Sequence, residues 1–216
     1  AEKQALLSLI DKYVPPLVEF CHRQGRHIVP LSDINLVQTM CNILDAMLST
    51  SDSGGTVQSL KNGNEVFMRS LEGKVMYSCV WGIGGALVNE KKFNCMDQFD
   101  RFWRETFNDI SFPAGGNVFD HYWETQEKSG GGFVNWKTKV SYNSVIPNSN
   151  LHTLFVATSE SLASSNLLSL LISQRHAVMF CGSAGTGKTS LVKDRLHALD
   201  PEMFSMREIH LNTCTD

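Results

Sequence analysis

The chain has 216 residues, of which 42% are hydrophobic and 19% charged, and its formal net charge at pH 7 is −3. This composition is typical of a soluble globular protein with one or two cores. The negative balance, without a basic stripe, argues against nucleic acid as a partner. The longest uncharged stretch, residues 75–88, is shorter than the roughly 20 residues that span a bilayer, so we expect a core helix there and no membrane partner.

The cysteine pattern favours free thiols over disulfides or zinc. The six cysteines lie far apart and never form a C-x-x-C pair, and four of them fall in segments expected to be helices or strands. We therefore expect buried thiols in a reducing compartment. The cysteines are Cys21, Cys41, Cys79, Cys95, Cys181 and Cys214.

The first half of the chain has the periodicity of helices. Apolar residues at helical spacing predict a helix over residues 2–13, which Pro15-Pro16 is expected to end, and a short second helix over residues 17–22. Ser32 or Asp33 can cap a third helix that runs to about residue 48. Turn signals follow at residues 51–55 and 61–64.

Two further helices complete the predicted bundle. Residues 65–88 form the longest apolar helix, and residues 94–97 resemble a capping box that opens a helix with four aromatic residues. Within the long helix, the glycines of residues 82–85 are interpreted as close helix packing or a helix end rather than a dinucleotide fingerprint. Cys21, His22 and His27 lack partners at ligand spacing and are interpreted as solvated or packed side chains.

A connector with turn and strand signals follows the bundle. Residues 112–117 read as a turn, residues 118–123 as a short strand, and residues 130–132 as a loop tip. Residues 133–140 can pair back as a second strand. The aromatic residues of this region are expected to pack onto a neighbour rather than stack on a ligand; they are Tyr122, Trp123 and Trp136.

The last part of the chain has the order of an α/β unit. Residues 154–158 are expected to be extended, and residues 161–173 to form an amphipathic helix. The short apolar run at residues 176–181 predicts a buried strand, and residues 190–199 place apolar residues at helical spacing. Residues 207–212 read as a further strand.

Between the expected strand and helix lies the sequence's most specific motif, which fits the P-loop pattern G-x-x-x-x-G-K-[ST]. Glycines let such a loop turn its backbone N–H groups toward phosphate oxygens. Lys188 would reach the β- and γ-phosphates, and the Thr189 hydroxyl would hold Mg²⁺. The motif comprises Gly182, Ser183, Ala184, Gly185, Thr186, Gly187, Lys188 and Thr189. A loop that binds nucleotide without hydrolysing it is the serious alternative. No Ser/His/Asp or Cys/His pattern in the sequence has credible spacing.

Together these residues resemble the dynein heavy chain family. The resemblance is carried, in the family's order, by residues 80–87, 112–122, 134–136, 155–158 and 182–189. It implies an α/β P-loop NTPase fragment of the AAA+ type, preceded by an all-α small helical bundle. The residues at 80–87 and 182–189 look more like those of axonemal than of cytoplasmic heavy chains. The connector and P-loop look most like those of outer-arm chains.

The resemblance also implies a domain plan. Residues 1–124 would be the small, or lid, domain of the second AAA+ module, residues 125–153 a connector with a possible hairpin, and residues 154–216 the start of the third module's large domain. ATP or ADP with Mg²⁺ would bind the P-loop, and Val156 would contact adenine. Ala157 stands where such relatives have proline, so the backbone there is expected to be less rigid.

The same resemblance leaves hydrolysis to residues outside the segment, with no catalytic residue inside it. Only two strands of a five-stranded AAA+ sheet can be recognised, which leaves the P-loop strand without neighbours and favours a piece of a longer polypeptide. The implied partners are the rest of the heavy-chain ring, microtubules through other parts, and other chains of an axonemal arm in a cilium or flagellum. The alternatives are an unrelated P-loop enzyme with a helical partner-binding domain, and a structural segment that only holds nucleotide.

Overall fold

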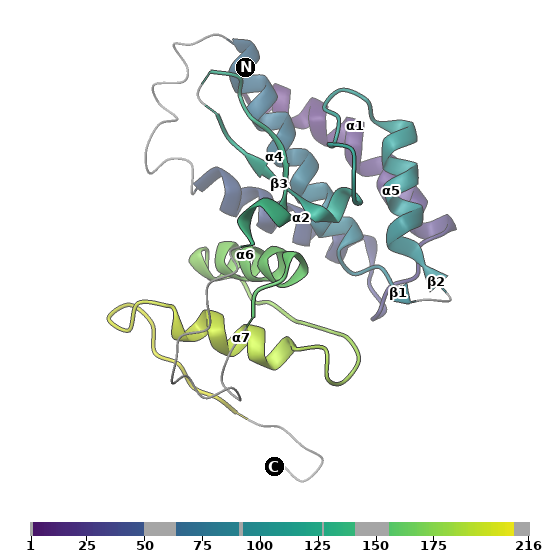
Figure 1. Cartoon of the computed structure of the whole chain (residues 1–216). Coiled ribbons are helices and arrows are strands. Elements are labelled where there is room, and N and C mark those ends of the chain that lie inside the picture. Colours follow the sequence, from purple (N-terminus) through teal and green to yellow (C-terminus); the bar gives the residue numbers. More distant parts are fainter. Residues whose placement is uncertain (1, 50–63, 91–92, 127, 141–155, 210–216) are drawn as a thin grey trace.

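A computed structural model describes residues 2–49, 64–90, 93–126, 128–140 and 156–209. Four long helices make up most of the described part of the first half (Figure 1). They are α1 (Glu2–Arg23), α2 (Asp33–Ser49), α4 (Asn64–Gly84) and α5 (Cys95–Thr106). The turn signals at residues 51–55 and 61–63 lie outside the described residues. No helix in the described ranges is both long and apolar enough to cross a membrane.

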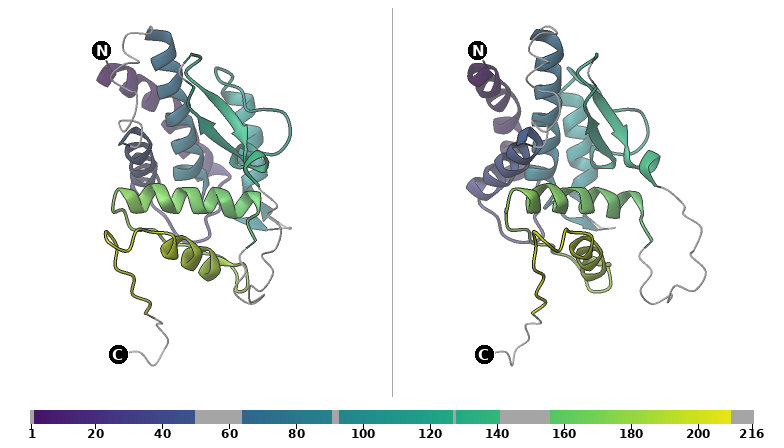
Figure 2. Two further views of the ribbon diagram at one scale, coloured as in Figure 1. Left: turned by 60° about the vertical axis from the view of Figure 1, so that its left-hand side comes forward. Right: turned by 90° about the vertical axis from the view of Figure 1, so that its left-hand side faces the viewer.

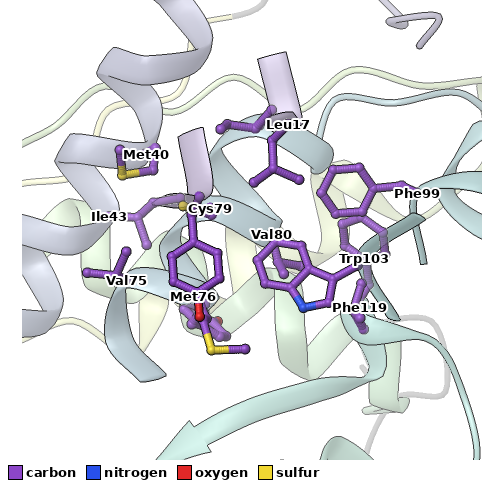
Figure 3. Close-up of a cluster of buried hydrophobic side chains, with 14 of the residues drawn as sticks. Leu17, Met40, Ile43, Val75, Met76, Cys79, Val80, Phe99, Trp103 and Phe119 are labelled. Atoms are coloured by element: carbon purple, nitrogen blue, oxygen red, sulfur yellow. The ribbon is translucent and has the colours of Figure 1, made fainter. Parts of the chain in front are cut away.

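Helix α4 lies at the centre of the bundle and packs against both α1 and α2. Figure 3 shows buried side chains from α1, α2, α4, α5 and the turn at residues 118–120 meeting in one core. Trp103 of α5 is 1% exposed and stacks on Tyr13 of α1 with ring centroids 5.9 Å apart. The predicted core helix over residues 75–88 is confirmed as far as Gly84, where α4 ends.

The prediction that Pro15-Pro16 ends the first helix is wrong, because α1 continues through both prolines. Each proline removes a backbone N–H and so one helical hydrogen bond. Burial compensates for this loss: one face of α1 is packed into the core, with Tyr13 and Leu17 fully buried. Tertiary packing can override local propensity in this way.

Polar contacts fasten α1 beside these prolines. The Tyr13 hydroxyl and the Lys12 ammonium both donate to Glu72 Oε1 of α4 at 2.8 Å, and Lys12 also pairs with Asp109 at 2.8 Å. Burial opposes the charge on Lys12, but its hydrogen bonds to Asp109 and Glu72 outweigh burial and raise its pKa. The network ties α1, α4 and the segment after α5 together.

The predicted helix starts are confirmed. The Ser32 hydroxyl accepts from the Asn35 N–H at 3.4 Å at the start of α2. At the start of α5, the Asn94 side chain accepts from the Asp97 N–H at 3.0 Å. Asp97 completes a variant of the capping box, since its carboxylate accepts from the Asn94 side-chain amide rather than from the backbone.

The glycines of residues 82–85 serve both roles expected of them. A Cβ on Gly82 would stand 2.4 Å from the Met40 Cα, so α4 and α2 cross here at backbone distance. Gly84 is the last residue of α4. Residues 85–88, which the sequence predicted to continue the helix, instead form a turn and an isolated bridge from Leu87 to His27. The strand pair β1 (Asn89–Glu90) and β2 (Phe93–Asn94) follows.

The connector forms the predicted hairpin, with shorter strands. Strands β3 (His121–Glu124) and β4 (Gly132–Asn135) are antiparallel, with His121 opposite Asn135. The flanking segments expected to be strand are instead 3-10 turns, η1 (Val118–Asp120) and η2 (Trp136–Lys139). Each turn is fixed by an asparagine whose side chain accepts a backbone N–H at its start, which favours a turn over an extended chain.

The aromatic residues of the hairpin pack onto the bundle, as predicted. Trp123 lies over Gly73 of α4, and Phe133 stacks on Phe112 with centroids 3.9 Å apart. Tyr122 and Trp136 are buried with ring centroids 4.6 Å apart. The hairpin therefore shares the core of the helical bundle.

Helix α6 (Ser159–Ser173) lies between the bundle and α7 (Lys188–His197), as the two views of Figure 2 show. It contacts α2, η1 and η2 on one side and α7 on the other. Thr158 and Ser161 form a reciprocal capping box at its start. A hydrogen bond from the Asn166 side chain to the Tyr77 hydroxyl, 3.3 Å long, joins α6 to α4.

The prediction of a buried strand at residues 176–181 is wrong for this structure. The segment has no ladder partner among the described residues, and Met179 is 73% exposed. An apolar run becomes a buried strand only when neighbouring strands cover it and satisfy its backbone, and the described residues supply no such strand. Residues 207–209 are likewise without strand structure, and the rest of that predicted strand lies outside the described ranges.

The thiols are largely as expected. Cys21, Cys79 and Cys95 are free and buried, and burial raises the pKa of Cys21 to about 11. Cys41 is exposed, contrary to the prediction, because it lies on the outer face of α2. Cys181 is half-buried, and Cys214 lies outside the described residues.

Candidate functional site

The loop from Gly182 to Thr189 joins the extended segment after α6 to the start of α7. Three of its glycines have positive φ: Gly182 at 154°, Gly185 at 78° and Gly187 at 80°. A Cβ on Gly185 or Gly187 would have nothing within 4 Å, so glycine is required there for backbone conformation rather than for space. The loop is exposed and its surroundings are open.

Helix α7 presents its N-terminus to this loop. Gly187 is the N-cap residue and no side chain caps the helix, while the first backbone hydrogen bond runs from the Leu191 N–H to the Gly187 carbonyl. The N–H groups of the first turn are therefore available to a ligand, and the helix dipole favours an anion at this end. Leu191, 7% exposed, anchors α7 in the packed interior.

The Lys188 side chain curls back into its own loop. Its ammonium donates to the Gly182 carbonyl at 3.0 Å, to the Ser183 carbonyl at 2.6 Å and to the Thr186 hydroxyl at 3.1 Å. The Thr186 hydroxyl in turn donates to the Ser183 carbonyl at 3.0 Å. The loop is thus closed around a positive charge, at the point where the motif predicts phosphate.

The remaining predicted residues are accessible. Thr189, in the first turn of α7, and Ser183 and Ala184, in the loop, are exposed. Val156 is 66% exposed in the segment leading to α6, the helix that packs on α7. Its surface is open to a ligand, and its contact with adenine stays a prediction.

The arrangement fits a phosphate-bearing ligand. An uncapped helix end, a glycine loop with open space and a lysine ammonium are together the groups that bind phosphate oxygens. In the part of the chain that the structure describes, no cluster of three or more His, Cys, Asp or Glu side chains could hold a metal ion.

Sequence reasoning found the loop and helix but missed how Lys188 is held. Thr186 occupies one of the four unspecified positions of the P-loop pattern, so the motif gives it no role. The periodicity of α7 likewise says nothing about acceptors within reach of Lys188. Only the folded loop shows that Gly182, Ser183 and Thr186 all meet the ammonium.

A glycine loop with the P-loop pattern at the N-terminus of α7 defines the class of P-loop proteins. The sequence pattern of the dynein heavy chain AAA lid domain matches residues 6–138, and that of the P-loop containing dynein motor region matches residues 144–216. The chain therefore belongs to the dynein heavy chain family.

Similar curated proteins include several axonemal chains. The chain is 31% identical, over all of its length, to the dynein beta chain of the flagellar outer arm of Chlamydomonas reinhardtii. It is 28% identical to human dynein axonemal heavy chain 9 over 99% of its length, and 29% identical to the Chlamydomonas flagellar outer arm alpha chain over 98%. It spans about 4% of the length of each of these relatives.

Proposed function

We propose that this chain is a segment of an axonemal dynein heavy chain, a microtubule motor ATPase, and that its loop at residues 182–189 binds ATP or ADP with Mg²⁺. The observation that carries the proposal is the loop itself, in which the glycine turns, the uncapped end of α7 and the Lys188 ammonium converge. The matches to both dynein patterns over consecutive ranges support the same assignment.

The proposal gives roles to two glycines of the loop, to Lys188 and Thr189, and to Val156. The backbone N–H groups of Gly185, Gly187 and the first turn of α7 would hold the phosphates. Lys188 would pair with the β- and γ-phosphates, and Thr189 would supply a hydroxyl to Mg²⁺. Val156 would pack against adenine. The metal ion would neutralise phosphate charge, and these side chains would hold and orient the ligand.

The loop contains no carboxylate or imidazole that could activate water. We therefore propose that it contributes half of a nucleotide site, and that hydrolysis depends on residues elsewhere in the heavy chain. The domain plan inferred from the resemblance is part of the proposal: a lid domain of the second module, a connector, and the start of the third module's large domain. Nucleotide at the third module would then regulate release from microtubules.

Family membership removes the unrelated P-loop enzyme from the alternatives. The remaining second candidate is a structural site that holds nucleotide permanently without turnover, which the lack of an acid or base in the loop also allows. The proposed partners are the rest of the heavy-chain ring, microtubules through other parts, and other chains of an axonemal arm. The proposed location is the axoneme of a cilium or flagellum, as in the names of the similar proteins.

The test replaces Lys188 and Thr189 by alanine, one at a time, in the heavy chain that contains this segment. ADP binding should protect peptides covering residues 182–197 from hydrogen exchange, whatever nucleotides bind elsewhere. We expect Lys188→Ala to weaken this protection with or without metal. Thr189→Ala should weaken it strongly with Mg²⁺ and little in EDTA, because only the metal contact is lost.

Motor activity separates the candidate roles. If the site is regulatory, Lys188→Ala leaves microtubule-stimulated ATPase activity measurable while release from microtubules slows. Complete loss of ATPase activity in a well-folded Lys188→Ala chain would make this the principal catalytic site. ADP that leaves exchange at residues 182–197 unchanged in the unmodified chain would refute binding at this loop.

A further inference from the structure

The hydrogen-bonding capacity of the Lys188 ammonium is fully used inside its own loop. A lysine ammonium has three N–H donors, and three acceptors surround it: the carbonyls of Gly182 and Ser183 and the hydroxyl of Thr186. Any phosphate oxygen that binds Lys188 must therefore replace at least one of these contacts. The loop is closed by its own lysine.

Thr186 differs from the other two acceptors because it is a side chain. Its contact with Lys188 is the longest of the three, at 3.1 Å. Its own hydrogen is donated to the Ser183 carbonyl at 3.0 Å, which turns an oxygen lone pair toward the ammonium. The two carbonyls are fixed by the backbone, so Thr186 is the acceptor that a substitution can remove without rebuilding the loop.

We propose that Thr186 is a positioning residue that sets the nucleotide affinity of this loop, because its hydroxyl holds the Lys188 ammonium in the closed form and is the first acceptor that a nucleotide phosphate displaces. The inference rests on the proposed nucleotide binding. Removing the hydroxyl leaves one ammonium donor to water in the free loop, while in the proposed bound form that donor meets a phosphate oxygen instead. The free form becomes less stable relative to the bound form, so nucleotide binds more tightly.

The size of the effect follows from the kind of bond. Hydrogen bonds to charged groups contribute more than neutral ones, but this loop is exposed and water competes for the ammonium. We therefore expect Thr186→Val, which keeps the shape of the side chain, to lower the ADP concentration for half-protection of residues 182–197 by roughly 3- to 10-fold. Thr186→Ser keeps the hydroxyl and should stay within about 2-fold of the unmodified chain.

A second measurement tests the Thr186–Lys188 contact without nucleotide. Pulse acetylation of the heavy chain, read by mass spectrometry, reports how tightly each lysine amine is held. Thr186→Val should make Lys188 react roughly 2- to 5-fold faster, since one of its three contacts is gone. Thr186→Ser should leave its rate unchanged. Lys193, on the same helix and paired with Glu208 at 2.7 Å, is the internal control and should not change in either variant.

The outcomes are separable. Weaker or unchanged ADP binding in Thr186→Val overturns the inference, as does an unchanged acetylation rate of Lys188. If Lys193 accelerates as much as Lys188, Thr186 supports the loop and helix in general, which also overturns it. The proposed function fails in a different way, through the absence of any ADP-dependent protection in the unmodified chain, and the affinity claim then fails with it.

Discussion

Gly82→Ala should force helices α2 and α4 apart. The added Cβ would stand 2.4 Å from the Met40 Cα and 2.5 Å from the Met40 nitrogen, while carbon atoms pack best at roughly 3.5–4.0 Å. The opposing atoms are backbone, so no rotamer change relieves the clash and α2 must move away from α4. A displacement of about 1 Å is required, since the contact must lengthen from 2.4 Å to at least about 3.5 Å.

The free energy of this change has two opposing parts. Overpacking costs about 1–3 kcal/mol, and a backbone clash belongs at the upper end of that range. Alanine is about 1 kcal/mol more favourable than glycine inside a helix. The net expectation is a loss of about 2 kcal/mol of stability, which is roughly a 30-fold increase in the opening equilibrium.

Hydrogen exchange of α2 and α4 in the heavy chain measures that opening equilibrium directly. The matched control is Gly132→Ala, where a Cβ would meet nothing within 4 Å, and we expect a change of less than about 0.5 kcal/mol. Unchanged or slower exchange in Gly82→Ala is the result that helix propensity alone predicts. It would refute the backbone crossing of α2 and α4 at this position.

Three other expectations follow from burial and pairing. Trp136 is 3% exposed where η2 meets α6, so Trp136→Ala should lower the free energy of unfolding by about 3–5 kcal/mol and speed hydrogen exchange in α6. Lys137 is exposed, so Lys137→Ala should change neither quantity. Equal effects of the two substitutions would place the tryptophan outside the core. Burial lowers the pKa of His121, whose Nδ1–H donates to the Asn117 carbonyl, so the unfolded chain takes up a proton here more readily than the folded chain. The free energy of unfolding should therefore be highest above about pH 6.5 and fall as the pH drops below it. Chemical denaturation at several pH values should show a flatter profile for His121→Gln, and an identical profile would exclude this histidine as the cause. In the 216-residue chain, amides of residues 178–181 should exchange fast because the described residues offer them no ladder partner, and strong protection in a monomer would contradict this.

Local signals predicted most of the helical half. Ser32 and Asn94 mark helix starts because a short polar side chain can accept an N–H within the same turn, and that requires no knowledge of the rest of the fold. The long-range contacts were not visible in this way. Nothing in the positions of Lys12, Tyr13 and Glu72 along the sequence predicts that their side chains meet. Their contacts help α1 to continue through its prolines.

At the candidate site, too, the sequence predicted the local features but not the contacts that depend on the fold. The P-loop pattern located the glycine turns and the start of α7, because positive φ angles and an uncapped helix end follow from the residue types. The strand before the loop was mispredicted because burial depends on neighbouring strands, which a local apolar run cannot report. The contact between Thr186 and Lys188 was missed because it depends on how the loop folds back on itself.

The central claim is that the loop at residues 182–189 is a nucleotide site of a dynein heavy chain. An electron cryomicroscopy map of the heavy chain with saturating ADP and Mg²⁺ tests it most directly. We expect diphosphate density against the first turn of α7, with the Lys188 ammonium turned from Thr186 toward a phosphate and the Thr189 hydroxyl beside the metal ion. A well-ordered loop without such density, with Lys188 still bonded to Gly182, Ser183 and Thr186, would contradict the account.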